Sequence, residues 1–362
     1  MAYLAFLAGA AALPSGLNSL FSPLVDARSP GLAVLVRKDG HSIFQKGYGV
    51  ADLRTGKSID ARTNFRLASC SKQFTALAAM LLVHDQKLKY DTRLADIFPD
   101  FPNYARGITI RHLLTHTSGL PDYEDLMNDS WSPVHQIQDE EVLALLKKAK
   151  PKFEPGTNWA YSNSGYVLLG LIVSRTAGMP FPQFLHDRIF GPLHMAGTIA
   201  YVPAANSVSH RAFGHTKEGD RFTETDQSAT SATLGDGGIY SNVEDLAKWD
   251  AALDSHTLLP EPEMKPALQP VQLQDGSQPH WPQTASDDNL HPGKPVSYGF
   301  GWFLDPYNGH PRMWHFGSTM GFRTAIERFT GNRLTIIVLC NRTDLDPGQL
   351  ALQAADQIMG SR

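Results

Sequence analysis

Cysteine is almost absent from this sequence, which contains only Cys70 and Cys340 among its 362 residues. Two cysteines exclude a disulfide framework and a structural zinc site built on thiolates. An excess of basic residues is also missing, because 32 Lys and Arg stand against 36 Asp and Glu, for a net charge of −4. Binding to nucleic acid or to an anionic membrane surface depends on clustered Lys and Arg, so we expect neither partner.

Long hydrophobic runs are missing as well. The most apolar stretch, residues 3–13, is shorter than the roughly 18 apolar residues that a membrane-spanning helix needs. Its small apolar side chains are typical of the core of a secretory signal, although no Lys or Arg precedes them. We therefore expect a signal-like segment at residues 1–16 and export to the periplasm or the extracellular space, with a cytoplasmic location as the alternative.

Strand patterns lie at both ends of the chain and helix patterns lie mainly between them. The predicted strands cover residues 32–37, 42–50, 298–304, 313–316, 323–329 and 334–339. The predicted helices cover residues 74–82, 110–116, 140–148, 166–175, 184–190, 245–253 and 348–359, with a capping box at Ser241 and Glu244 before the sixth of them. No internal repeat and no glycine-rich phosphate loop is present.

This order predicts an α/β fold in which an antiparallel sheet is made from the N- and C-terminal segments and flanked by helices. A mostly helical lobe is inserted between the two halves of the sheet. We predict one domain over residues 28–360. Its sheet lobe comprises about 28–66 and 296–360, and its helical lobe about 67–295.

A Ser-x-x-Lys sequence opens the first long helix pattern. Ser69 and Lys72 are one helical turn apart and face the same side, so a hydroxyl and an amine meet at a helix N-terminus. The unpaired N–H groups there stabilise an alkoxide or oxyanion, and burial lowers the pKa of a lysine so that it can act as a base. Taken alone, the pattern is more typical of a serine cap followed by a surface lysine.

Two further motifs follow this pair. Tyr161 and Asn163 form a Tyr-x-Asn triplet on a loop, where a phenol can transfer a proton and an amide can hold a substrate or a lysine. His315 and Gly317 form a His-x-Gly triplet on a late predicted strand, and the peptide N–H of Ser318 can face that of Ser69 to bind a carbonyl oxygen. In isolation each triplet is common in turns and at strand ends.

In this order the three motifs resemble those of the serine β-lactamase and penicillin-binding-protein superfamily, and within it the branch of class C β-lactamases, D-alanyl-D-alanine carboxypeptidases and esterases. The resemblance extends over roughly residues 28–360. Neighbouring segments share it, at residues 65–69, 110–119, 154–157, 237–241 and 298–302.

The resemblance implies a serine hydrolase that works through an acyl-enzyme. Ser69 is then the nucleophile, Lys72 and Tyr161 act as a coupled general base and acid, and the N–H groups of Ser69 and Ser318 form the oxyanion hole. Asn163 and Gly317 contact the substrate. His315 lines the pocket, relays protons or, when charged, binds a substrate carboxylate. No cofactor or metal is expected, and the partner is a small-molecule or peptide substrate.

One departure from the pattern bears on the substrate. Dedicated β-lactamases of this type carry Lys where His315 stands, and a bulky Phe316 replaces the usual Thr. A histidine is largely uncharged at neutral pH and is less suited to the carboxylate of a β-lactam. We therefore expect an esterase or a D-peptidase in preference to an efficient β-lactamase. Oligomeric state and the exact substrate stay open.

Two alternatives remain at this point. His112 and His116 have the four-residue spacing of zinc ligands on a helix, which would suit a metallohydrolase, but no Glu lies between them to act as a base. A receptor that is acylated and does not turn over would use the same serine motif.

Overall fold

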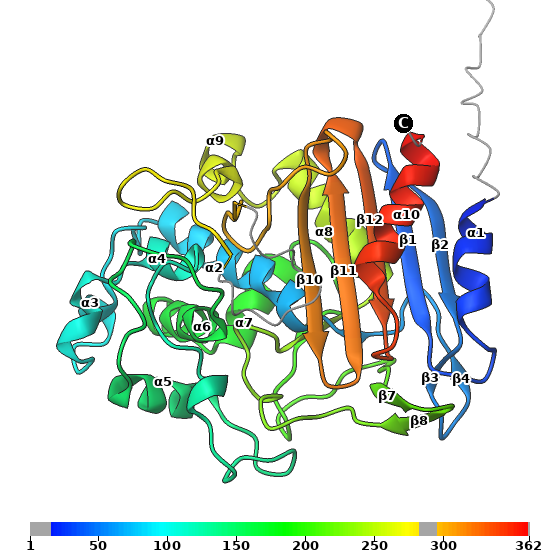
Figure 1. The fold of residues 1–362 in the computed structure, drawn as a ribbon, viewed down its shortest axis with the longest axis horizontal. Helices are drawn as coiled ribbons and strands as arrows, with labels where there is room; N and C mark the ends of the chain where they lie inside the picture. Colours follow the sequence, from blue (N-terminus) through cyan, green and yellow to red (C-terminus); the bar gives the residue numbers. More distant parts are fainter. Residues whose placement is uncertain (1–15, 282–294, 361–362) are drawn as a thin grey trace, which may run out of the picture.

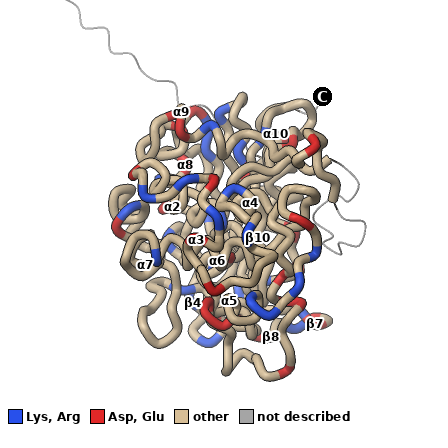
Figure 2. Tube along the Cα trace, turned by 90° about the vertical axis from the view of Figure 1, so that its left-hand side faces the viewer, with Lys and Arg blue, Asp and Glu red and all other residues tan. Residues whose placement is uncertain are grey.

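The computed structural model describes residues 16–281 and 295–360. The predicted signal-like segment, apart from Gly16, lies outside the described residues. Within the described ranges, no helix combines the length and the apolar character needed to cross a membrane. Acidic and basic positions are interspersed along the chain (Figure 2).

A five-stranded antiparallel sheet is built from the two ends of the chain, as predicted (Figure 1). Its strand order is β10-β11-β12-β1-β2. The strands are β1 (Leu32–Lys38), β2 (His41–Tyr48), β10 (Met313–Thr319), β11 (Phe322–Phe329) and β12 (Leu334–Cys340). The first hairpin turns at Asp39 and Gly40, both with positive φ, and this left-handed pair matches the twist of the strands that it joins.

Strands β1 and β12 are buried along almost their whole length because both faces of the sheet are covered. On β1, Leu32 and Val34 pack into a core under α1 (Gly16–Phe21) and α10 (Pro347–Met359), whereas Leu35 packs into a larger core on the opposite face. Helix α8 (Val243–Ser255) packs on that opposite face, behind the sheet in Figure 1. The period of two along a strand assigns alternate residues to the two cores.

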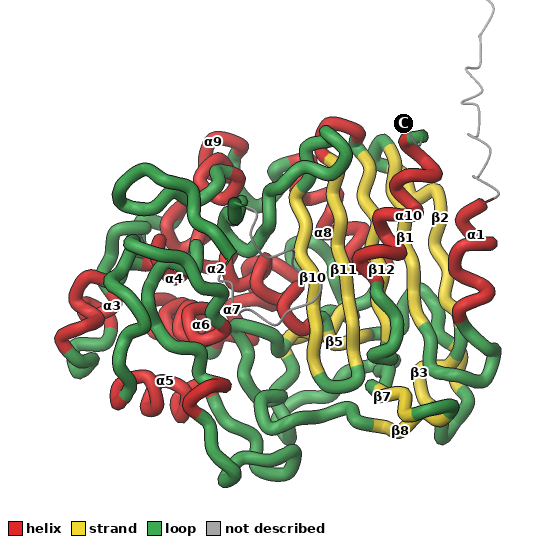
Figure 3. Tube along the Cα trace, viewed as in Figure 1, coloured by secondary structure: helices red, strands yellow, loops and turns green. Residues whose placement is uncertain are grey.

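Helices dominate the other half of the molecule, where α2 (Lys72–His84) packs against α6 (Asn163–Ala177) (Figure 3). The remaining helical elements are η1 (Ser22–Leu24), η2 (Ala68–Ser71), α3 (Leu94–Ile97), η3 (Asn103–Gly107), α4 (Ile110–Leu114), η4 (Glu124–Leu126), α5 (Asp139–Lys148), α7 (Phe181–Leu185), η5 (His186–Phe190), α9 (Glu261–Met264), η6 (Lys265–Leu268) and η7 (Thr330–Asn332). Short strands complete the fold, namely β3 (Val50–Asp52), β4 (Lys57–Ser58), β5 (Phe65–Arg66), β6 (Ile199–Ala200), β7 (His215–Glu218), β8 (Arg221–Glu224) and β9 (Ile239–Ser241). The predicted boundaries of the two lobes stay a prediction.

The strand predicted at residues 298–304 is wrong. This segment forms a turn with isolated bridges from Phe303 to Tyr298 and to Trp314. Gly301 has a φ of +77°, and a Cβ there would lie 2.8 Å from the Cα of Gln73. The segment therefore bends to pack closely against the start of α2, and its alternating apolar residues do not form a strand.

Three predicted helix boundaries also differ. The helix predicted at 110–116 ends at Leu114, and His116 has a left-handed φ of +61°. The helix predicted at 184–190 begins earlier as α7 and continues as a π-helical turn over His186–Phe190. The N-cap of α8 is Asn242, whose side chain accepts a hydrogen bond from the N–H of Asp245, so the predicted capping box at Ser241 is wrong by one residue.

Candidate active site

Ser69 lies in the short turn η2 that joins β5 to α2, between the sheet and the helical half of the molecule. The residue before it, Ala68, is buried and has a φ of +48°, in the left-handed region that non-glycine residues seldom adopt. Such local strain is common at functional sites, where the surrounding packing enforces it. The turn presents the Ser69 hydroxyl to the Nζ of Lys72, which donates a hydrogen bond to it over 2.9 Å.

The ammonium group of Lys72 is fully buried and has three hydrogen-bond acceptors. Besides the Ser69 hydroxyl, they are the Oδ1 of Asn163 at 2.8 Å and the carbonyl oxygen of Asp236 at 3.0 Å. A charged ammonium donates to all three. A neutral amine can still donate to Asn163 and Asp236, while its lone pair accepts the proton of the Ser69 hydroxyl, so deprotonation converts this arrangement into a nucleophile paired with its base.

Burial lowers the pKa of Lys72 to about 8. The negative charges of Asp236, Asp122 and Glu124 oppose this effect by favouring the charged form, in that order of size. The result is a lysine that loses its proton near neutral pH, where an ordinary lysine stays charged. A general base is most effective when its pKa lies close to the working pH.

Tyr161 lies against the same amine. Its ring centroid is 4.9 Å from the Nζ of Lys72, and its hydroxyl is buried without a hydrogen-bond partner among the described residues. Burial raises the pKa of Tyr161 well above its usual value, and the hydroxyl of Ser69 is the group that opposes the rise. The phenol and the Ser69 hydroxyl therefore face each other without the geometry of a regular hydrogen bond in this state.

Asn163 is the first residue of α6, and Ser162 caps that helix by accepting a hydrogen bond from the N–H of Gly165. The backbone N–H of Asn163 donates to the Oδ2 of Asp122 over 2.7 Å. Fixed in this way, its side chain directs the Oδ1 at Lys72. The residues of the Tyr-x-Asn triplet therefore lie next to the Ser-x-x-Lys pair.

His315 is fully buried beside Tyr161, with ring centroids 6.2 Å apart. Its Nδ1 lies 2.7 Å from the carbonyl oxygen of Phe316, which only accepts, so Nδ1 carries the proton and Nε2 accepts from the hydroxyl of Tyr298 at 3.1 Å. Burial and the charge of Lys72 lower the pKa of His315 to about 3. A neutral ring with both nitrogens engaged lines the site, and this arrangement argues against the predicted alternative of a charged carboxylate binder.

Gly317 lets β10 approach the turn that carries Ser69. A Cβ at this position would lie 2.1 Å from the carbonyl oxygen of Leu67 and 2.3 Å from the Oγ1 of Thr324. The missing side chain therefore permits a close approach to the protein's own backbone, and the contact of Gly317 with substrate stays a prediction. Ser318 follows on the exposed part of the same edge strand, which packs against η2. That the backbone N–H groups of Ser318 and Ser69 together form an oxyanion hole stays a prediction.

Several residues of the site were missed in the sequence. Asp122, Glu124 and Asp236 surround Lys72, and desolvation raises the pKa of Glu124 to about 7 although part of that residue is exposed. Tyr298 binds His315, and His116 packs on Tyr161. No spacing rule identifies these residues, because they come from four separate segments that only the tertiary fold brings together.

The alternative metal site is not formed. His116 lies beyond the end of α4, so it does not share a helix face with His112. Within residues 16–281 and 295–360, no group of three or more His, Cys, Asp or Glu side chains is arranged to hold a metal ion. Cys70 is a buried core residue, and burial raises the pKa of its thiol to about 12 while the thiol donates to the carbonyl oxygen of His315.

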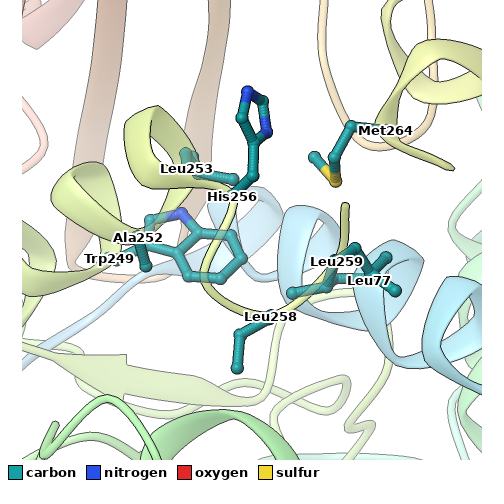
Figure 4. Close-up of a pocket in the computed structure, with 8 residues that line it drawn as sticks. All are labelled: Leu77, Trp249, Ala252, Leu253, His256, Leu258, Leu259 and Met264. Carbon is teal, nitrogen blue, oxygen red and sulfur yellow. The ribbon is translucent and has the colours of Figure 1, made fainter. Parts of the chain in front are cut away.

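A separate cavity between α2 and α8 is apolar and has a volume of about 10 Å³ (Figure 4). It is lined by Leu77, Trp249, Ala252, Leu253, His256, Leu258, Leu259 and Met264. This volume is about the minimum that a single water molecule needs. Neither Ser69 nor Lys72 lines this cavity, and none of its lining side chains is a hydroxyl, a thiol or an amine.

The site is a buried Ser–Lys pair with a facing tyrosine on a helix-flanked antiparallel sheet, an arrangement that is chemically suited to acyl transfer. The chain belongs to the beta-lactamase family, whose model matches residues 17–358. Its relatives include penicillin-binding protein 4* of Bacillus subtilis, 30% identical over 95% of this chain and 75% of that protein. A D-aminopeptidase of Cereibacter sphaeroides is 26% identical over 87% of this chain and 57% of its own length.

Solved structures show the same fold. The D-amino acid amidase of Ochrobactrum anthropi superposes with a TM-score of 0.77, covering 96% of this chain and 98% of the amidase at 23% sequence identity. The predicted family and the predicted fold class are thereby confirmed.

Proposed function

We propose that this protein is a serine hydrolase that forms an acyl-enzyme at Ser69 and acts on esters or on amides and peptides of D-amino acids. The observation that carries the proposal is the hydrogen bond of 2.9 Å between the Ser69 hydroxyl and a buried Lys72 whose pKa is about 8. A hydroxyl is a weak nucleophile until an adjacent base takes its proton, and this pair supplies that base.

The proton follows a short route through the site. As the Ser69 Oγ forms its bond to the substrate carbonyl carbon, its proton passes to the neutral amine of Lys72. The coupled phenol of Tyr161 delivers a proton to the leaving alcohol or amine as the ester or amide bond breaks, and it receives the former Ser69 proton from Lys72 in exchange. In the second half-reaction a water molecule gives its proton to the same pair, attacks the acyl carbon and releases the acid, and Ser69 regains its proton.

Three observations favour esters and D-aminoacyl substrates over β-lactams. His315 is neutral and hydrogen-bonded on both nitrogens, so it supplies no permanent positive charge for the carboxylate of a β-lactam. The carboxyl groups of Asp122 and Glu124 lie beside Lys72, where negative charge suits a substrate with an ammonium group next to its scissile carbonyl. The relatives named above include a D-aminopeptidase, and a D-amino acid amidase shares the fold.

The test is a side-by-side assay of a short-chain nitrophenyl ester, a D-amino acid amide, a D-alanyl-D-alanine peptide and a chromogenic cephalosporin. We expect turnover of the ester and the D-amino acid amide, and little turnover of the cephalosporin. Ser69→Ala should abolish turnover and covalent labelling by a fluorophosphonate probe. Labelling that persists in that variant would place the nucleophile elsewhere, and a burst without turnover on every substrate would favour an acylated receptor.

A further inference from the structure

His116 is a buried residue that the proposed reaction leaves unused, although it packs directly on the site. It lies two residues beyond the end of α4, is 1% exposed and has a φ of +61°. The left-handed conformation turns the chain so that both the backbone and the ring of His116 face the loop that carries Tyr161. A non-glycine residue held in this region points to a functional constraint.

Two hydrogen bonds from the Tyr161 loop end on His116, one on each side of the tyrosine. The N–H of Ala160 donates to the carbonyl oxygen of His116 over 3.1 Å. The N–H of Ser162 donates to the Nδ1 of the imidazole, also over 3.1 Å. The backbone N–H groups of the residues before and after Tyr161 are therefore both bound by the same residue.

The imidazole also packs on the phenol itself. The ring centroids of His116 and Tyr161 are 4.4 Å apart, with an angle of 33° between the planes. The rings of Tyr298 and Tyr166 pack around the same imidazole at 4.7 and 5.2 Å, so it has no room to change rotamer without displacing an aromatic neighbour. Backbone and ring contacts together define where the Tyr161 hydroxyl points.

The protonation state of the imidazole follows from these contacts. Because Nδ1 accepts from a peptide N–H, the single proton of the neutral ring resides on Nε2, which has no partner among the described residues. Burial, with the nearby charge of Lys72, keeps the pKa of His116 well below its usual value. The ring thus remains an acceptor for Ser162 at neutral pH and does not itself transfer protons.

We propose that His116 is a positioning residue for Tyr161, and that its Nδ1 holds the phenol in the orientation that faces Ser69 and Lys72. The inference rests on the proposed function, because it assigns the proton-transfer role to Tyr161. It predicts that acylation of Ser69 depends on an acceptor at this position more than on the ring.

Two substitutions separate the acceptor from the ring. His116→Phe keeps an aromatic ring and removes the acceptor. His116→Asn removes the ring, keeps an acceptor at the same distance from the backbone as Nδ1 and tolerates a left-handed φ. We expect His116→Phe to slow fluorophosphonate labelling of Ser69 about tenfold or more with ester KM unchanged, and His116→Asn to stay within about threefold of the unsubstituted protein.

A matched control is His215→Asn. His215 is another fully buried histidine, and its Nδ1 lies 3.3 Å from the carbonyl oxygen of Asn341, away from Tyr161. This variant should label at the rate of the unsubstituted protein. If His116→Phe does not fold, His116→Asn and His116→Leu repeat the comparison, because the two side chains match in size and only Asn carries an acceptor.

A double-mutant cycle with Tyr161→Phe decides whether His116 acts through the phenol. We expect Tyr161→Phe to label slowly and the addition of His116→Phe to cause no further loss. An additional loss of the same factor, or a normal labelling rate for His116→Phe while Tyr161→Phe is slow, would overturn this inference alone. A normal labelling rate for Tyr161→Phe would instead contradict the proposed proton route, so the two failures are distinguishable.

Discussion

At the scale of a single residue, two opposing effects act on the protonation state of Lys72. Removing the amine from water favours its neutral form, which the reaction needs, whereas the carboxylates of Asp236, Asp122 and Glu124 favour the charged form. The first effect is the larger, so the pKa falls from 10.5 to about 8. A base that is partly neutral at physiological pH is the consequence.

This shift predicts the pH dependence of acylation. Lys72 is a base only without its proton, so the rate of Ser69 labelling should rise as the pH increases through about 8 and level off above it. Measuring labelling across neutral and alkaline pH checks the prediction. Lys72→Arg, which stays charged throughout, should lose at least about 100-fold in rate, and a flat profile in the unsubstituted protein would contradict the assignment.

Gly317 permits the close approach of β10 to the turn that carries Ser69, and we expect the site to depend on that approach. Gly317→Ala should lower both the labelling rate and stability, because its Cβ would collide with the carbonyl oxygen of Leu67 and push β10 away from the turn that holds Ser69. Gly331→Ala is the control, since a Cβ there would meet nothing nearer than 3.7 Å. Urea unfolding and labelling of both variants test the idea, which fails if Gly317→Ala behaves like the control.

At the scale of elements, α8 is attached to the sheet by buried charges. The carboxylate of Asp250 accepts from Arg37 at 2.5 Å, from Arg328 at 2.6 Å and from the Thr335 hydroxyl at 2.7 Å. Removing one partner from such a cluster leaves the other charges buried and unpaired, which costs more than the pair contributes when it is intact.

Asp250→Ala should therefore reduce the free energy of unfolding by about 3–5 kcal/mol. Asp254→Ala serves as the control, because Asp254 pairs with the same Arg328 while its side chain is 53% exposed, and exposed ion pairs contribute about 0–1 kcal/mol. Urea denaturation of both variants gives the two values. Equal effects would show that burial does not determine the strength of this attachment.

At the scale of the whole molecule, one sheet is shared by two hydrophobic cores. Strand β1 contributes Leu32 to the core under α1 and α10, and Leu35 to the core that continues into the helical half. Neither core can be lost without breaking the strand that serves both, so we expect the molecule to unfold as one cooperative unit.

Leu32→Ala and Leu35→Ala test this expectation with one residue type on opposite faces of one strand. Each should lower the free energy of unfolding by about 2–5 kcal/mol and shift a single transition that fluorescence and Ser69 labelling report together. If Leu32→Ala separated the loss of fluorescence from the loss of labelling, the two cores would be independent units.

Much of this architecture was predictable, because the information is local. Continuous apolar strands at both ends of the chain indicated the sheet, and the Ser-x-x-Lys and Tyr-x-Asn motifs indicated residues that do meet in space. The errors arose where tertiary contact overrides local pattern. The segment that contains Gly301 turns against α2, although its apolar residues alternate as in a strand. His116 lies beyond the end of its predicted helix and accepts hydrogen bonds from a distant loop. The carboxylates around Lys72 acquire their influence from burial, which no spacing reveals.

The assembly of the sheet from both ends of the chain has a consequence for biosynthesis. When a ribosome has made the first 300 residues, the nascent chain already contains the nucleophile and its proton carriers, yet β10, β11 and β12 do not exist. Until β12 is made, β1 has no partner strand on the side that β12 will occupy. The five-stranded sheet can therefore be completed only when translation is nearly finished, and the turn that carries Ser69 gains its contacts with β10 and β11 at that late stage.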